Sequence, residues 1–95
     1  MIAELSFTPL SGNDNTDAAT AEAVKVVKAS GLEYSVTPMS VVVQGEWNQV
    51  MDTARKCHEQ SLASNDRIAF NIRLDDGGNS ASLADRVSAI ENIAG

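Results

Sequence analysis

Residues 33–44, EYSVTPMSVVVQ, decide how the chain folds. Tyr34 and Val36 alternate with polar neighbours, Pro38-Met39 interrupts the run, and three valines follow at 41–43. Period-two alternation and β-branched residues are typical of strands, and a proline between them marks a turn. The stretch therefore predicts two short strands joined as a hairpin. Three apolar residues in succession indicate a strand that is covered on both faces.

An amphipathic helix is predicted on each side of this hairpin. Residues 17–30 place Thr20, Ala23, Val24 and Val27 on one face, with Thr16 as a candidate N-cap and Gly31 as a left-handed C-cap. The second helix follows Gly45 and stops at Asn65. Its predicted apolar stripe contains Trp47, Val50, Met51, Ala54, His58 and Leu62.

Further outward, residues 2–9 and 67–75 alternate as strands do. One face of the first carries Ala3, Leu5 and Phe7, and one face of the last carries Ile68, Phe70, Ile72 and Leu74. Ser82 and Asp85 match the start of a capping box, so a final helix is expected after Ser82.

The predicted order is β-α-β-β-α-β followed by a helix. This order predicts an α+β, ferredoxin-like domain over residues 1–95, with a four-stranded antiparallel sheet and an additional C-terminal helix. Right-handed crossovers place the two main helices on one sheet face and leave the other open. The residues expected on the open face are Glu4, Ser6, Thr8, Thr37, Val42, Gln44, Asn71 and Arg73.

Composition excludes several classes of function. The 95 residues carry seven basic and thirteen acidic side chains, a net charge of −6 that repels nucleic acid and anionic membranes. No apolar run approaches the ~20 residues of a membrane-spanning helix, and the N-terminus does not resemble a signal peptide. Cys57 is the single cysteine, so an internal disulfide is impossible. We expect a cytoplasmic protein in a reducing compartment.

No catalytic or metal-binding motif is present. Phosphate-binding loops, nucleophile elbows and zinc-ligand spacings are all missing. His58 is the single histidine, and its place on an apolar stripe favours a buried structural side chain over a catalytic one. Cys57 beside it is expected to be a small core residue. Trp47 is expected to pack under the start of its helix. No catalytic residue, metal or cofactor is therefore predicted.

The open sheet face has two interpretations. It is either a solvated or subunit-facing surface with a charge ladder, for example Glu4 beside Arg73, or a pocket for a flat heterocycle with hydroxyls and amides at its edges. Val42 beside Ile2 and Met39 would expose apolar area in a monomer, which favours a homo-oligomer, most simply a tetramer built from dimers.

Nearly the whole chain resembles one family. The segments that carry the resemblance are MIAELSFTPL, AEAVKVVKASGLEY, PMSVVVQGEWNQVM, KCHE and DRIAFNIRLDD. They resemble the small thiamine-binding, YkoF-like proteins, formerly a family of unknown function. The resemblance implies a ferredoxin-like fold, a homotetramer, no catalysis, and binding of thiamine or its hydroxymethylpyrimidine moiety near subunit contacts.

Three positions depart from that family pattern. Ser40 and Val41 stand where a threonine is expected, Gln44 stands where a glutamate is expected, and Gly77-Gly78 replaces arginines. A carboxylate could both accept hydrogen bonds from an aminopyrimidine and offset a thiazolium charge, whereas Gln44 can do only the first. The residues predicted to contact a ligand are Ser6, Thr8, Leu10, Ser11, Thr37, Met39, Ser40 and Gln44.

Three functions follow from these observations. The first is non-catalytic binding of thiamine or a related pyrimidine. The second is a structural or regulatory homo-oligomer that has lost ligand binding, which the departures at Val41 and Gln44 favour. The third is an enzyme of the dimeric αβ-barrel kind, which would need an acid–base residue on the open face and ranks last.

Overall fold

The computed structural model describes residues 1–10, 15–78 and 81–95. In these ranges the chain follows the predicted order of strands and helices. The elements are β1 (Ile2–Pro9), α1 (Thr16–Ser30), β2 (Glu33–Val36), β3 (Val41–Gln44), α2 (Trp47–Ser64), β4 (Ile68–Asp75) and α3 (Leu83–Ala94). This order confirms the α+β, ferredoxin-like class predicted from residues 33–44 and their flanks.

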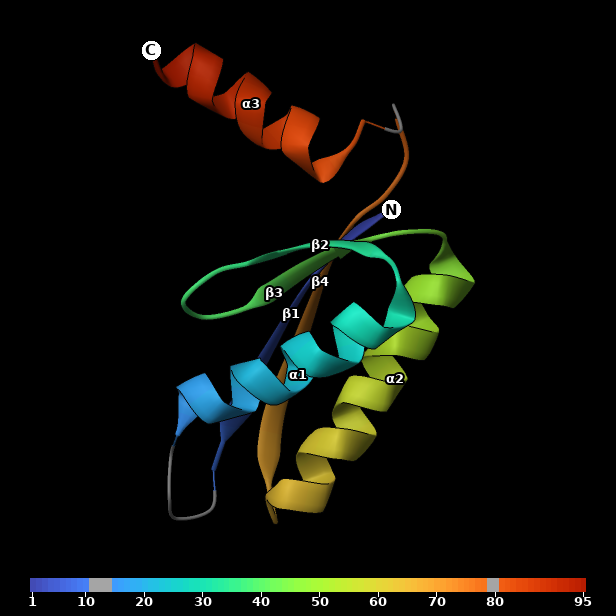
Figure 1. Ribbon diagram of the computed structural model, residues 1–95, viewed down its shortest axis with the longest axis vertical. Coiled ribbons are helices and arrows are strands. Elements are labelled where there is room, and N and C mark those ends of the chain that lie inside the picture. The colour runs from blue at the N-terminus through green and yellow to red at the C-terminus, as the bar shows by residue number, and fades with distance from the viewer. Residues whose placement is uncertain (11–14, 79–80) are drawn as a thin grey trace.

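The four strands form one antiparallel sheet in the order β2-β3-β1-β4. β1 lies inside the sheet because it pairs with β3 along one edge and with β4 along the other. α1 and α2 pack against each other and contact the same face of the sheet (Figure 1). In the part of the chain that the structure describes, the opposite face carries no helix along most of its length, as the sequence predicted (Figure 1).

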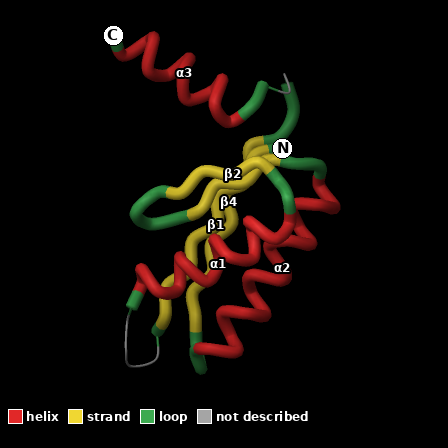
Figure 2. The backbone as a smooth tube through the Cα atoms, viewed as in Figure 1, coloured by secondary structure: helices red, strands yellow, loops and turns green. Residues whose placement is uncertain are grey.

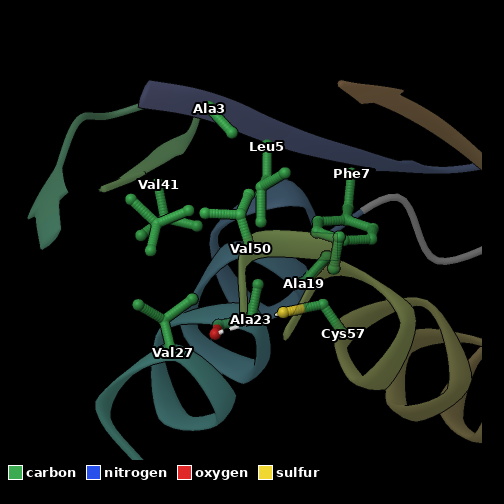
Figure 3. Close-up of a cluster of buried hydrophobic side chains, with 11 residues drawn as sticks. Ala3, Leu5, Phe7, Ala19, Ala23, Val27, Val41, Val50 and Cys57 are labelled. Atoms are coloured by element: carbon green, nitrogen blue, oxygen red, sulfur yellow. Dashed lines mark hydrogen bonds between the residues drawn. The ribbon is translucent and has the colours of Figure 1, made fainter. Parts of the chain in front are cut away.

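The core lies between the sheet and the two helices. Alternate residues of β1 and β3 point into it, so Leu5, Phe7 and Val41 are buried (Figure 3). Val43 is buried as well. Phe7 stacks on Phe70 of β4 with ring centroids 4.2 Å apart. The two inward valines are buried, whereas Val42 between them is half-buried on the other face, so a second cover over this strand stays a prediction.

Most helix ends follow the predicted chemistry. Asn15, not Thr16, caps α1, because its side chain accepts a hydrogen bond from the Ala18 amide. Gly31 ends that helix with φ of +76°, a left-handed conformation that suits glycine. Asn65 ends α2, and Ser82 caps α3 by accepting from the Asp85 amide, as predicted.

The buried face of α2 differs from the predicted stripe. Its buried residues are Val50, Thr53, Ala54, Cys57 and Ser61. His58 and Leu62 are exposed and Trp47 is 54% exposed, so the predictions that His58 is buried and that Trp47 packs under its helix are wrong. Small residues occupy most of the buried face because α2 packs closely against the alanines of α1. The Cys57 thiol, for example, reaches the Ala23 carbonyl at 3.7 Å.

α3 stands apart from the other two helices, at the opposite end of the molecule from the C-terminal end of α2 (Figures 1 and 2). Leu83 in its first turn is buried and the helix contacts β2. Three apolar side chains farther along are exposed: Val87, Ile90 and Ile93. Among the described residues, none of the helices combines the length and apolarity needed to cross a membrane.

Candidate functional site

The strand register sorts the open face into rows of side chains. Antiparallel neighbours lie on the same face, so Glu4 of β1 stands between Val42 of β3 and Arg73 of β4. The next row places Ser6 beside Asn71. The observed register confirms the prediction that Glu4 and Arg73 are neighbours on adjacent strands.

Three polar residues form a hydrogen-bonded chain beside Ser6. The Ser40 hydroxyl donates to Glu4 Oε2 at 3.0 Å, and Thr37 Oγ1 lies 2.8 Å from Ser40 Oγ. Because the hydrogen of Ser40 goes to the carboxylate, we assign Thr37 as the donor to Ser40. Ser40 is only 4% exposed, so the chain holds the Glu4 carboxylate in one orientation.

A hollow of about 470 Å³ lies on the other side of Glu4. It is lined by Ile2, Glu4, Val42, Arg73, Leu74, Asp75 and Asp76. This volume falls within the range of small-molecule sites. Ile2 and Val42 offer apolar surface. The charged groups of the lining are three carboxylates and one guanidinium, so acidic groups outnumber basic ones. The hollow therefore suits a flat molecule with hydrogen-bond donors or a positive charge.

Gln44 lies at the far end of the open face. It is four residues from Ser40 along β3, which is about 13 Å at the rise of a strand. Its Nε2 donates to the Ala81 carbonyl at 2.6 Å, and its Oε1 accepts from the Leu83 amide at 3.0 Å. Both ends of the amide therefore hold the C-terminal segment, which crosses this end of the face. Contact between Gln44 and a ligand stays a prediction.

The other predicted ligand residues lie at different distances from the hollow. Thr37 and Ser40 are hydrogen-bonded to each other, and Ser6 pairs with Asn71 of β4 one row beyond Glu4. Thr8 is one row farther along β1, and Met39 is 75% exposed at the tip of the hairpin. Leu10 is exposed and its amide donates to the Arg67 carbonyl. Ser11 lies outside the described residues.

Sequence reasoning missed the residues that build the hollow itself. Glu4 was expected on the open face only as part of a charge ladder, and neither Asp75 nor Asp76 was among the predicted ligand residues. Period-two alternation already placed Glu4 on the face of Ser6, so that signal was available. The approach of Asp75 to Ile2 could not be found in the same way, because it depends on the pairing of the first and last strands.

Cys57 and His58 lie on the helical side of the sheet. Cys57 is 1% exposed, and its burial raises the pKa of the thiol from 9.0 to about 11. This confirms the prediction of a small core residue. The ring of the exposed His58 stacks over Phe70 with centroids 6.2 Å apart. Neither side chain faces the hollow, since Phe70 and Cys57 belong to the opposite face.

Comparison with known proteins supports this view of the fold. The sequence profile described as thiamine-binding protein matches residues 3–91. The chain belongs to the thiamine-binding protein family. This confirms the resemblance seen in the sequence.

Individual relatives of the family are distant in sequence. A UPF0045 protein of Mycobacterium bovis is 27% identical over 93 residues, covering 96% of this chain and 91% of that protein. A UPF0045 protein of Methanocaldococcus jannaschii is 22% identical over 76 residues, covering 80% and 76%.

Two solved structures share the fold over nearly their full length. The crystal structure of a hypothetical protein from Methanocaldococcus jannaschii superposes with a TM-score of 0.84 at 21% identity, covering 95% of this chain and 94% of that one. A Thermotoga maritima protein assigned provisionally to thiamine biosynthesis or salvage gives 0.81 at 17% identity, covering 94% and 96%. At these identities the likeness concerns the fold alone.

Proposed function

We propose that this protein binds thiamine or a related aminopyrimidine in the hollow beside Glu4, without catalysing a reaction. The observation that carries the proposal is that Glu4, whose carboxylate accepts a hydrogen bond from the buried Ser40 hydroxyl, lines the hollow together with the apolar side chains of Ile2 and Val42. An aminopyrimidine offers N–H donors at its edge and flat apolar faces. Membership of the thiamine-binding family supports this ligand class.

Charge at the rim favours the cationic form of such a ligand. Glu4, Asp75 and Asp76 outnumber Arg73 around the hollow. The thiazolium of thiamine carries one positive charge, whereas hydroxymethylpyrimidine is neutral. In this proposal Glu4 supplies the carboxylate that Gln44 lacks, so the departure at Gln44 does not require loss of binding.

Calorimetric titration of the wild type and of Glu4→Gln with both ligands tests the proposal. Gln keeps an acceptor but loses the charge, so we expect thiamine affinity to fall about tenfold and that for hydroxymethylpyrimidine to fall less. Glu59→Gln is the matched control, because that glutamate lies exposed on α2 away from the hollow. Absence of heat with both ligands in the wild type would contradict the proposal.

A homo-oligomer without ligand is the second candidate. The exposed apolar side chains of α3 and of β4, including Val87, Ile90, Ile72 and Leu74, favour an assembly of subunits. Assembly by itself is compatible with ligand binding, since the family resemblance implies a ligand near subunit contacts; the two candidates differ in whether a ligand binds. We therefore propose an oligomeric protein that binds a small molecule, and the calorimetric titration tests whether it binds.

A further inference from the structure

The C-terminal helix places a cation at the rim of the acidic hollow. Arg86 Nη1 lies 3.0 Å from Asp75 Oδ2, and Asp75 lines the hollow. We propose that Arg86 is a built-in counter-ion of this site, and that a cationic ligand competes with it for Asp75 and thereby loosens α3. This inference rests on the proposed function, because it assumes that the hollow is where the ligand binds.

The contacts that hold α3 are concentrated in its first turn. Gln44 binds the segment through Ala81 and the Leu83 amide, and the Leu83 side chain is 7% exposed. Arg86 adds the ion pair one turn later. Beyond it, exposure rises from 49% at Val87 to 87% at Ile93. Loss of the ion pair therefore removes the contact of α3 that lies just before its exposed part. We expect the helix to become more mobile as a result.

Competition arises from the charges that share the rim. Glu4, Asp75 and Asp76 are the acidic groups and Arg73 is the basic group of the hollow itself, so Arg86 is a second cation brought by α3. A ligand cation repels Arg86 and is attracted to the same carboxylates. Since the ion-pair side chains are 48% and 56% exposed, solvent screens the effect and it is modest.

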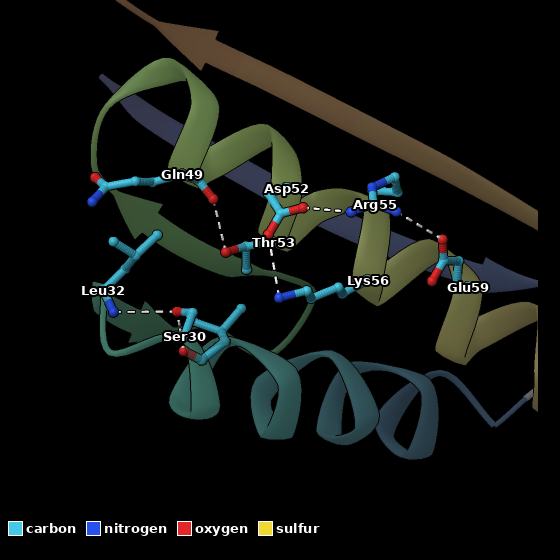
Figure 4. A network of polar contacts seen from close by, with 9 residues as sticks. Ser30, Leu32, Gln49, Asp52, Thr53, Arg55, Lys56 and Glu59 are labelled. Carbon is cyan, nitrogen blue, oxygen red and sulfur yellow. Dashed lines mark hydrogen bonds and ion pairs between the residues drawn. The ribbon is translucent and has the colours of Figure 1, made fainter.

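Arg86→Gln tests the counter-ion role by titration. We expect the variant to bind thiamine about two- to fivefold more tightly than the wild type, as an exposed pair of this kind allows, with no change for neutral hydroxymethylpyrimidine. Arg55→Gln is the matched control, because Arg55 pairs with Asp52 on the outer side of α2 (Figure 4). It should leave both affinities unchanged.

Each outcome of the titration has one meaning. Equal thiamine affinity in the wild type and Arg86→Gln would overturn the counter-ion role while leaving the proposed function in place. Binding of thiamine by neither protein would overturn both. An equal gain in affinity for thiamine and for hydroxymethylpyrimidine would also overturn the counter-ion role, because the effect would then not depend on the charge of the ligand.

Hydrogen exchange measures the coupling to α3 directly. We expect saturating thiamine to speed exchange of the amides of residues 83–94, and Arg86→Gln without ligand to do the same. The amides of α1 serve as the internal reference. Slower exchange in α3 with thiamine would overturn the inference, since the helix would then close over the ligand instead of being released.

Discussion

Glu4 shows how one side chain can combine two tasks. Its Oε2 atom accepts a hydrogen bond from the Ser40 hydroxyl, and this bond fixes the orientation of the Glu4 side chain. Glu4 also lines the hollow. Gln44, at the position where the family pattern has glutamate, instead holds Ala81 and Leu83. Gln44→Glu would keep an acceptor for the Leu83 amide but lose the donor to Ala81. Any gain in ligand affinity there would therefore come with a weaker hold on α3.

Cys57 gives a pH dependence that can be isolated. Its pKa is raised by burial from 9.0 to about 11, so the folded protein holds the thiol proton more tightly than the unfolded chain does. The resulting stabilisation is fully present below pH 9 and is lost as the pH rises toward 11. We expect the free energy of unfolding of the wild type to fall more steeply over this window than that of Cys57→Ala.

Denaturant titrations at several pH values measure this difference. The Cys57→Ala protein retains every other titratable group of the chain, so the difference between the two profiles isolates the thiol. Parallel pH profiles for the two proteins would show that the thiol is not desolvated in the folded state.

At the scale of elements, α2 illustrates a limit of helical periodicity. The predicted stripe correctly included Val50 and Ala54, but the buried face is rotated from its centre by about 70°, away from Trp47 and His58 and toward Cys57. Large apolar residues pointed to the wrong face because α1 offers alanines at the contact. Close helix packing then selects small partners, Thr53 and Ser61 among them.

Paired substitutions in α2 test this orientation. Val50 is fully buried and Met51 half-buried, so Val50→Ala should lower the free energy of unfolding by about 2 kcal/mol, even after its small gain in helix propensity. Met51→Ala should cost less than half as much. Thermal and denaturant unfolding measure both values, and a larger loss for Met51→Ala would place the buried face where the periodicity first suggested.

At the scale of the whole molecule, apolar surface remains uncovered in two regions. Ile72 and Leu74 are exposed on β4, whose outer edge pairs with no other strand among the described residues, and Val87, Ile90 and Ile93 are exposed on α3. A long strand with an unpaired edge and apolar side chains is a site for pairing with another chain. The small core of a 95-residue domain makes such association more valuable for stability.

We therefore predict a homo-oligomer, either a dimer or a tetramer. Light scattering coupled to size exclusion should give a multiple of the 10.0 kDa chain mass at micromolar concentration. Ile72→Asp and Ile90→Asp test the two regions separately, and the region whose variant lowers the mass is the interface. A wild-type mass of 10.0 kDa would contradict the prediction.

The predictive power of the sequence varied with the range of the interaction. The strands at 2–9 and 68–75 and the caps at Gly31, Asn65 and Ser82 were foreseen, since each depends on neighbouring residues. Alternation placed Ser6 and Thr37 on the open face, whereas the hydrogen bond between Thr37 and Ser40 was not predicted. The acidic hollow did not, because Glu4, Val42 and Asp75 meet only through the pairing of three strands.

Local patterning was enough to establish the element order, the α+β class and the polar character of the open face, because period and turn chemistry are properties of short segments. The third dimension decided which side of α2 is buried, which carboxylate is oriented by hydroxyls, and where Arg86 lies. These depend on packing and charge between residues 34 to 39 positions apart or, for Asp75 and Arg86, on the path of the C-terminal segment. Contacts of that kind leave no periodic trace in a single sequence.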